Sequence, residues 1–349
     1  MKRIDGIGAL KIGITAAFGR PLSIHTRTVF DAVHSAMTMQ PMAIRNRISL
    51  IWTSDSMSRF GGMHAARYLI SQQVSIVVGH YSSSAANAAR AHYRSFGIPL
   101  ILPASSDDRL TERPIGRNRW PDTFRLCAPN SQLASALMNA IRDAIGNGRI
   151  HLLIDESRYG KTLGESIRRA IDFASGLTLV TVAETADCCI IVGHFESVVN
   201  RVRECSAATS NELIFIVDDG VHPKIIELVP GRCHHRLFGV APAAKTHDFN
   251  AKPSLPTRRH SRNMGQRPPF FLETVAAVEI AVRAVTERGC EGPSLSRTLA
   301  TREWNTAMGK ISFSSDGDNT EISFSLWAVR GEKFSAIAEI TDCSADPRR

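Results

Sequence analysis

The chain has 349 residues, of which 43% are hydrophobic and 21% are charged, so its composition is that of a folded globular protein and excludes a disordered one. A chain of this length exceeds one ordinary hydrophobic core, and two lobes are expected. The formal net charge of +9 arises from 42 basic and 33 acidic residues. Because the basic residues are dispersed and no nucleic-acid-binding motif is present, no specific nucleic-acid partner is predicted.

Targeting signals and cysteines bear on the compartment. Residues 1–8 are short and charged and lack the apolar core of about 7–15 residues that a secretory signal requires. The seven cysteines form no CxxC pair. Both features predict a cytoplasmic protein as the sequence stands, or a periplasmic one if the true start lies upstream. No stretch approaches the roughly 20 apolar residues of a membrane span, so no membrane insertion is expected.

The first part of the chain alternates short apolar segments with helical patterns. The expected elements are strands at Ala9–Ala16 and Ile48–Trp52 and helices at Thr26–Met39 and Gly62–Gln72. This alternation predicts repeated β-α units and therefore a mainly parallel sheet.

The stretch from Val74 to Ser106 predicts a β-α-β unit that carries a binding site. Two buried strands, Val74–Val78 and Ile98–Leu102, flank an Ala-rich helix, Ala85–Phe96. Both strands end in small hydroxyl residues, and parallel strands bring those ends to the edge where ligands of open α/β folds bind. The N–H groups at the start of the helix suit an anion such as a carboxylate. The pattern indicates a site for a small zwitterion, although serines that only cap the helix would give the same residues.

The second part of the chain repeats the alternation. The expected elements are helices at Ser131–Ile145 and Phe270–Thr286, strands at Arg149–Ile154, Thr178–Ala183, Cys188–Val192 and Leu213–Val217, and a final hairpin of Ser323–Val329 with Ser335–Ile340. Cys188 and Cys189 should point to opposite faces of their strand, which favours a role in the core over a metal site. The segment Pro242–Pro269 is rich in Pro, Arg, Lys and His and predicts a loop or linker.

No sequence motif predicts catalysis. The chain lacks a G-x-S-x-G elbow and an HExxH motif, and Gly160-Lys161-Thr162 is not a phosphate loop because Asp155 stands where the first glycine is required. His234 and His235 are adjacent and lack acidic or cysteine partners at ligand spacing. We therefore predict no catalytic residue, no metal and no cofactor, and the chain is not expected to be an enzyme.

The motif at Val74–Ser106 resembles the first-lobe core of the leucine/isoleucine/valine-binding proteins, which have the type I periplasmic binding fold and serve ABC importers. In that family a strand, Gly-His, serines, a helix, Gly-Ile, a second strand and Pro-Ala-x-Ser/Thr form half of an amino-acid site. Asp155–Gly160 resembles the family's Asp-x-x-x-Tyr-Gly, and Ser315–Asp318 resembles its closing turn. The family's first-lobe disulfide would need cysteines near Ser56 and Ser82, where this chain has serines.

The resemblance implies an α/β fold of two lobes, each a mainly parallel sheet flanked by helices, joined by a three-strand hinge with the ligand cleft between them. Lobe 1 is expected to comprise residues 1–126 plus 252–322, and lobe 2 residues 127–251 plus 323–349. His80 and His194 stand at strand ends and are expected to face the cleft.

The resemblance also assigns the ligand contacts by position. Ser83, Ala104 and Ser106 would hold the carboxylate and ammonium groups of an amino acid from lobe 1. Asp219 would neutralise the ammonium from lobe 2. The side-chain pocket would be shaped by Tyr159, His194 and Phe270.

The function implied is that of a solute-binding protein that captures a small amino acid or amide by hinge closure, as the substrate-binding component of a branched-chain-amino-acid-type ABC transporter. Its partner would then be an ABC permease. Two alternatives stay open. The chain could be a cytoplasmic, amide-responsive ligand sensor that acts on a regulatory partner, or a degenerate protein that no longer binds ligand and serves as an interaction surface.

Overall fold

The structure is a computed structural model that describes residues 10–18, 24–112, 120–207, 212–243, 270–287 and 294–340. The chain divides into two compact units. Unit 1 comprises Met1–Cys127 and Lys245–Glu321, and unit 2 comprises Ala128–Ala244 and Ile322–Arg349. The chain therefore passes from one unit to the other three times. Among the described residues, none of the helices combines the length and the apolar character that a membrane crossing needs.

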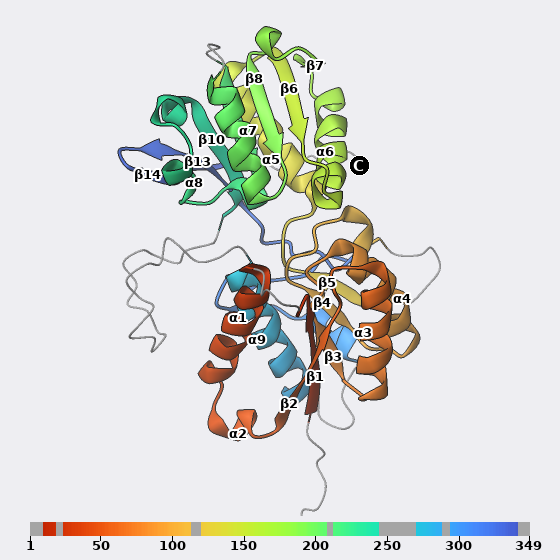
Figure 1. Ribbon diagram of the computed structural model, residues 1–349. Coiled ribbons are helices and arrows are strands. Elements are labelled where there is room, and N and C mark those ends of the chain that lie inside the picture. Colours follow the sequence, from red (N-terminus) through yellow and green to blue (C-terminus); the bar gives the residue numbers. More distant parts are fainter. Residues whose placement is uncertain are drawn as a thin grey trace, which may run out of the picture. The chain divides into compact units, whose positions relative to one another are not determined.

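Unit 1 is built on a five-stranded parallel sheet with the order β2-β1-β3-β4-β5 (Figure 1). Its strands are β1 (Leu10–Ala16), β2 (Ile48–Ser54), β3 (Ile76–Val78), β4 (Leu100–Leu102) and β5 (Thr123–Arg125). Its longer helices are α1 (Ile24–Met39), α3 (Arg59–Ser71), α4 (Ser83–Ser95) and α9 (Phe271–Glu287). Shorter elements are α2 (Met42–Arg45), α10 (Leu295–Thr301) and an antiparallel pair, β11 (Trp304–Thr306) with β12 (Gly309–Ile311).

The alternation of side chains along each strand explains the two helical layers of unit 1. Ile76 and Val78 of β3 point into the cluster packed by α1 and α9, whereas Val77 between them points into the cluster packed by α3 and α4. All three side chains are at most 2% exposed. A strand with both faces covered reads as a continuous apolar run, as this one does.

Helices α3 and α4 pack so closely that only glycine fits at position 62. A Cβ atom on Gly62 would lie 2.3 Å from the carbonyl oxygen of Ala85 and 2.7 Å from its Cα. Because this obstacle is backbone, Gly62→Ala should force the two helices apart and destabilise unit 1 by about 1–3 kcal/mol in urea unfolding. In the matched control, Gly231→Ala, the new Cβ would meet no atom within 4 Å. Equal unfolding midpoints for the two variants would contradict the packing argument.

Unit 2 contains a seven-stranded sheet with the order β14-β13-β10-β9-β8-β6-β7. Its strands are β6 (Gly148–Ile154), β7 (Leu177–Val180), β8 (Cys188–Val192), β9 (Leu213–Val217), β10 (Leu237–Pro242), β13 (Phe324–Arg330) and β14 (Lys333–Ile340). Strands β6 to β10 pair in parallel, and the hairpin of β13 and β14 adds antiparallel to β10. Helices α5 (Asn130–Ile145) and α6 (Arg158–Phe173) cover one face, and α7 (Phe195–Ala207) and the short α8 (Ile225–Leu228) cover the other (Figure 1).

Most elements expected from the sequence are present, and some of them begin or end at other residues than expected. Helix α4 begins at Ser83, earlier than the expected Ala85, and its N-cap Ser82 makes no capping bond but donates its hydroxyl to the Met57 carbonyl at 3.2 Å. Strand β7 ends at Val180, and a 3₁₀ turn occupies Ala183–Thr185, where the strand was expected to finish. Cys188 and Cys189 do lie in the clusters on opposite faces, which confirms their expected core role.

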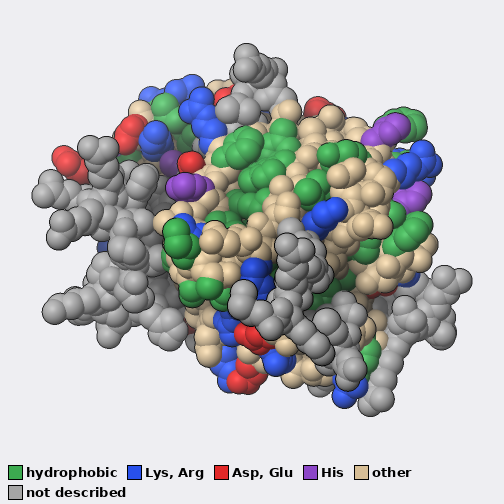
Figure 2. Space-filling view, turned by 90° about the horizontal axis from the view of Figure 1, so that it is seen from below, with side chains coloured by type: hydrophobic (Ala, Val, Ile, Leu, Met, Phe, Trp, Pro, Cys, Tyr) green, Lys and Arg blue, Asp and Glu red, His purple; other side chains and the backbone are tan. Residues whose placement is uncertain are grey.

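Two features concern the basic residues. The segment expected to be a basic loop, Pro242–Pro269, lies outside the described residues from position 244 onward. On the face seen in Figure 2, the described Lys and Arg side chains lie in several separate groups among hydrophobic and acidic ones.

Candidate functional site

In unit 1, the serines expected to bind ligand lie where β3 and β4 end. Ser83 is the first residue of α4, and its hydroxyl accepts the backbone N–H of Asp107 at 3.4 Å. Ala104 is 8% exposed, and Ser106 beside it is half-buried. The buried Ser105 donates its hydroxyl to the carbonyl of His80 at 2.8 Å and so ties the two strand ends together. The positive end of the α4 dipole lies at this edge, which suits an anion.

His80 supports this edge from inside. It was expected to face the cleft, and this was wrong, because the side chain is 0% exposed. Its Nδ1 lies 2.7 Å from the Asp55 carboxylate, and its Nε2 lies 3.3 Å from the Tyr93 hydroxyl. Burial, reinforced by Asp55, raises the pKa of Tyr93 above its usual range, so that hydroxyl stays protonated. Inside the core, both ring nitrogens of His80 therefore have a polar partner, one from the segment after β2 and one from α4.

Phe270 joins the same edge through an aromatic contact. It directly precedes α9, and its ring lies edge-on to that of Tyr81 with centroids 6.3 Å apart. The Tyr81 hydroxyl bonds to the hydroxyl of Thr274, which donates to the Phe270 carbonyl at 2.7 Å. We call Ser83, Ala104 and Ser106 the serine edge. Because Tyr81 lies two positions before Ser83, these bonds fix the start of α9 beside the serine edge.

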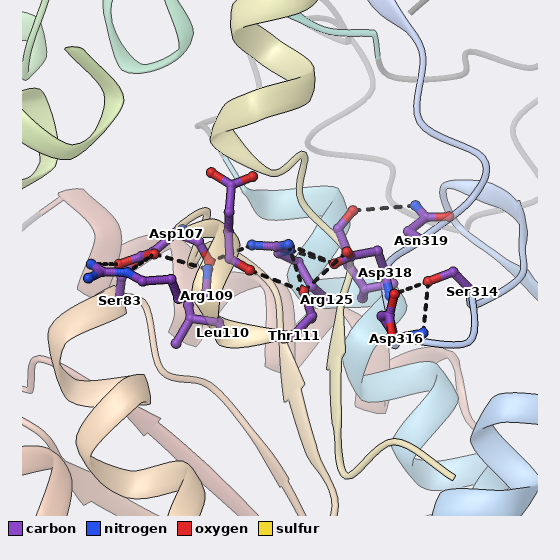
Figure 3. Close-up of polar contacts among 12 residues, drawn as sticks. Ser83, Asp107, Arg109, Leu110, Thr111, Arg125, Ser314, Asp316, Asp318 and Asn319 are labelled. Atoms are coloured by element: carbon purple, nitrogen blue, oxygen red, sulfur yellow. Dashed lines mark hydrogen bonds and ion pairs between the residues drawn. The ribbon is translucent and has the colours of Figure 1, made fainter. Parts of the chain in front are cut away.

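A network around Arg125 connects the serine edge to a distant turn (Figure 3). The guanidinium, 1% exposed, donates to the Asp318 carboxylate at 2.8 Å, to the Asp107 carbonyl at 2.7 Å and to the Thr111 hydroxyl at 2.9 Å. Asp107 in turn donates its backbone N–H to Ser83. Arg125 was not predicted as a site residue, because its main partner lies 193 residues away in the chain.

Unit 2 gathers the other three expected site residues into one contact group. The rings of Tyr159 and His194 stack with centroids 5.2 Å apart and planes 24° apart. His194 Nδ1 lies 3.1 Å from the Asp219 carboxylate, and the Tyr159 hydroxyl donates to the Asp218 carboxylate at 2.8 Å. These residues follow β6, β8 and β9, which are neighbours in the sheet. We call Tyr159, His194, Asp218 and Asp219 the acidic-aromatic group.

Asp155 orients this group and was not predicted to do so. One carboxylate oxygen accepts the backbone N–H of His194 at 2.9 Å, and the other accepts that of Ser157 at 3.1 Å. Ser157 caps α6 by accepting the N–H of Gly160 at 2.9 Å, which sets the position of Tyr159. A Cβ on Gly193 would lie 2.4 Å from the Asp155 carboxylate, so this close approach requires glycine. The available signal was the spacing Asp155-x-Ser157-x-x-Gly160.

The charges of the acidic-aromatic group follow from its contacts. The hydrogen bond to Asp219 raises the pKa of His194, against the opposing effect of partial burial. Burial first, and then the charges of Asp218 and Asp219, raise the pKa of Tyr159 well above its usual value, so it acts as a hydroxyl donor. The group therefore offers carboxylates backed by a hydroxyl and an imidazole, a set that attracts a cation. Within the described ranges, no three His, Cys, Asp or Glu side chains are grouped so that they could hold a metal.

The link between His194 and Asp219 is testable by NMR titration. We expect the His194 ring to titrate above about 6.5, the value of an unperturbed histidine, and to move back toward it in Asp219→Asn. Because folding raises the pKa of His194, its contact with Asp219 stabilises the folded protein fully at pH values below the pKa of the unfolded chain. This stabilisation is lost as the pH rises through the pKa of the folded protein. An equal midpoint in both proteins would contradict the contact.

Comparison with known proteins shows which family the chain belongs to. Residues 11–221 match the family model described as periplasmic binding protein. This is more than half of the chain. The chain belongs to the periplasmic binding protein family.

The proteins similar to this chain have names that refer to the binding of amino acids or of other solutes. A Leu/Ile/Val-binding protein homolog of Brucella abortus is 24% identical over 330 residues, which cover 90% of this chain and 86% of that protein. A branched-chain amino acid transporter substrate-binding protein of Streptococcus pneumoniae, solved with isoleucine, has a TM-score of 0.74 at 18% identity and covers 95% of this chain and 99% of that one. A solute-binding protein of Rhodopseudomonas palustris, solved with 3,4-dihydroxybenzoic acid, has a TM-score of 0.76 at 15% identity, with 97% and 99% covered.

These findings confirm the predicted relationship to the leucine/isoleucine/valine-binding proteins and the predicted type I fold class. The protein is a solute-binding protein, and its family is one of binding proteins and not of enzymes. Members of the family are periplasmic, so the expectation of a cytoplasmic protein gains no support.

Proposed function

We propose that this protein binds a small L-amino acid or a related amide and serves as the substrate-binding component of a branched-chain-amino-acid-type ABC transporter. The observation that carries the proposal is the acidic-aromatic group, in which Asp219 lies beside a stacked Tyr159 and His194 at the ends of adjacent strands. A carboxylate in this setting pairs with an ammonium group, and the two rings supply an apolar and polarisable wall.

Unit 1 supplies the complementary half of the proposed site. The hydroxyls of Ser83 and Ser106, with the backbone N–H groups at the start of α4, would donate hydrogen bonds to the α-carboxylate of the ligand. The carbonyl of Ala104 would accept one ammonium proton, and Phe270 would pack on the ligand side chain. Ser83 is backed by the Arg125 network, so its edge is held before ligand arrives and little ordering entropy is lost on binding.

A ligand that contacts both units would select a closed state by its extra contacts. In this proposal the amino acid pairs with Asp219 on one side and with the serine edge on the other. An ABC permease would then distinguish loaded from empty protein by the closed state. The proposed compartment is the periplasm, as for the family.

A thermal-shift screen tests the proposal. The purified chain is scanned with the twenty L-amino acids, short aliphatic amides and 3,4-dihydroxybenzoate, the last because a structural neighbour was solved with it. Ligand at about 100 times its dissociation constant stabilises the folded state by about 2.7 kcal/mol, a clear rise in midpoint. We expect the rise with one class of amino acid or amide. A rise with the aromatic acid alone, or with no compound, would contradict an ammonium-binding site.

A further inference from the structure

Two cysteines of unit 2 lie side by side in the layer packed by α7. The Sγ atoms of Cys189, on β8, and Cys205, near the end of α7, are 3.9 Å apart across 16 positions of sequence. Cys189 is fully buried, whereas Cys205 is half-buried. Cys188 is also fully buried but belongs to the cluster on the opposite face of the sheet. The pair therefore lies on one face of the sheet, and Cys205 is the less buried of its two residues.

The two thiols differ in the way that disulfide exchange requires. The two sulfur atoms lie within hydrogen-bond distance, and this contact lowers the pKa of Cys205 and raises that of Cys189. Cys205 is thus the better nucleophile, and it is also the less buried one. A third thiol of the same cluster, Cys233, donates to the Pro230 carbonyl at 3.0 Å.

We propose that Cys189 and Cys205 form a redox-active dithiol that closes into a disulfide when the chain meets a low-molecular-weight disulfide such as oxidised glutathione. In the first step the Cys205 thiolate attacks one sulfur of the reagent, a mixed disulfide forms, and one glutathione thiolate leaves. In the second step Cys189 loses its proton to solvent, attacks the Cys205 sulfur and expels the second glutathione thiolate. The protein loses two electrons and two protons, and the reagent becomes two thiols.

Closure requires the two sulfur atoms to approach each other. Their separation would fall from 3.9 Å to the disulfide bond length of about 2.05 Å. The bond would join β8, which ends just before His194, to the helix that begins just after it. Cross-linking this loop restricts the unfolded chain, so the oxidised form should unfold at a temperature several degrees higher than the reduced form.

The experiment uses the full chain, reduced and then equilibrated with reduced and oxidised glutathione at several ratios before alkylation. Trypsin digestion without reduction should release Ala170–Arg201 joined to Glu204–Lys224. The whole protein should lose about 2 Da and two alkylatable thiols. Because Cys188 and Cys189 share one tryptic peptide, Cys188→Ala and Cys189→Ala are compared. The cross-link should persist in Cys188→Ala and disappear in Cys189→Ala and Cys205→Ala.

Three results would overturn the proposal. One is a stable mixed disulfide with glutathione on Cys205 that never resolves. Another is a cross-link from Cys205 to Cys233, which would show the wrong partner. The third is an unchanged thiol count at all glutathione ratios in protein whose circular dichroism shows it to be folded. The outcome is independent of whether the chain binds an amino acid.

Discussion

Replacing Asp219 with alanine is expected to weaken binding of the amino-acid ligand by about 30-fold to a few thousand-fold, equivalent to about 2–5 kcal/mol. The reason is that the ligand's ammonium would then be buried without its counter-charge. The side chain of Asp219 is only 10% exposed, and little water could replace it in the complex. Isothermal titration calorimetry of wild type and variant with the compound that gives the largest thermal shift measures the effect.

The stability of the free protein should change little in this variant. His194, the partner of Asp219, has a side chain 47% exposed, and water can satisfy it once the carboxylate is gone. Asp219→Asn keeps the shape and removes the charge, so it should lose nearly as much affinity as alanine. Asp172→Asn, on the exposed surface of α6, is the matched control and should bind as wild type does. An affinity for Asp219→Asn within threefold of wild type would remove Asp219 from the site.

Replacing Arg125 with methionine is expected to destabilise unit 1 by about 3–5 kcal/mol. The buried guanidinium bonds to three residues on two segments. Its removal takes a hydrogen-bond donor from the Asp318 carboxylate and from the Asp107 carbonyl (Figure 3). The backbone on either side adds further ties, since Arg125 donates its N–H to the Gly317 carbonyl at 2.8 Å. Urea unfolding monitored by circular dichroism measures the loss.

The magnitude is tested against an exposed ion pair. Arg149 and Asp187 form such a pair, with side chains 52% and 43% exposed, so Arg149→Met should cost no more than about 1 kcal/mol. Arg125→Lys keeps the charge but not the planar fork of donors, and should fall between wild type and Arg125→Met. If Arg125→Met and Arg149→Met shifted the unfolding midpoint equally, the Arg125 network would contribute no more to the free energy of unfolding than an exposed ion pair does.

The sequence was sufficient to predict where polar residues meet strand ends, but not which partners they take. Apolar runs located β8 and β9 to the residue, whereas β3 and β4 each begin two residues later than their apolar runs. The same reasoning placed His194 and Asp219 at neighbouring strand ends, and the structure brings them within hydrogen-bond distance.

Side chains that pair across distant segments are not marked by any periodic pattern in the sequence. Arg125 pairs with Asp318, which lies 193 positions away in the chain, and no local pattern marks either residue as part of a pair. His80 was misplaced for the same reason. Its buried partners are Asp55, which follows β2, and Tyr93 on α4, and only their arrangement shows that the ring points inward. Local propensity fixes elements, whereas pairing within the core is a property of the tertiary fold.

The central claim is that the site recognises the α-ammonium and α-carboxylate groups of one small molecule. Calorimetric titration of the full chain with the best amino acid and with its two analogues, one lacking the ammonium and one lacking the carboxylate, tests it most directly. We predict that each analogue binds at least about 30-fold more weakly, and that Asp219→Asn shrinks the penalty only for the analogue without the ammonium. Equal affinity for the amino acid and either analogue would contradict the proposed site.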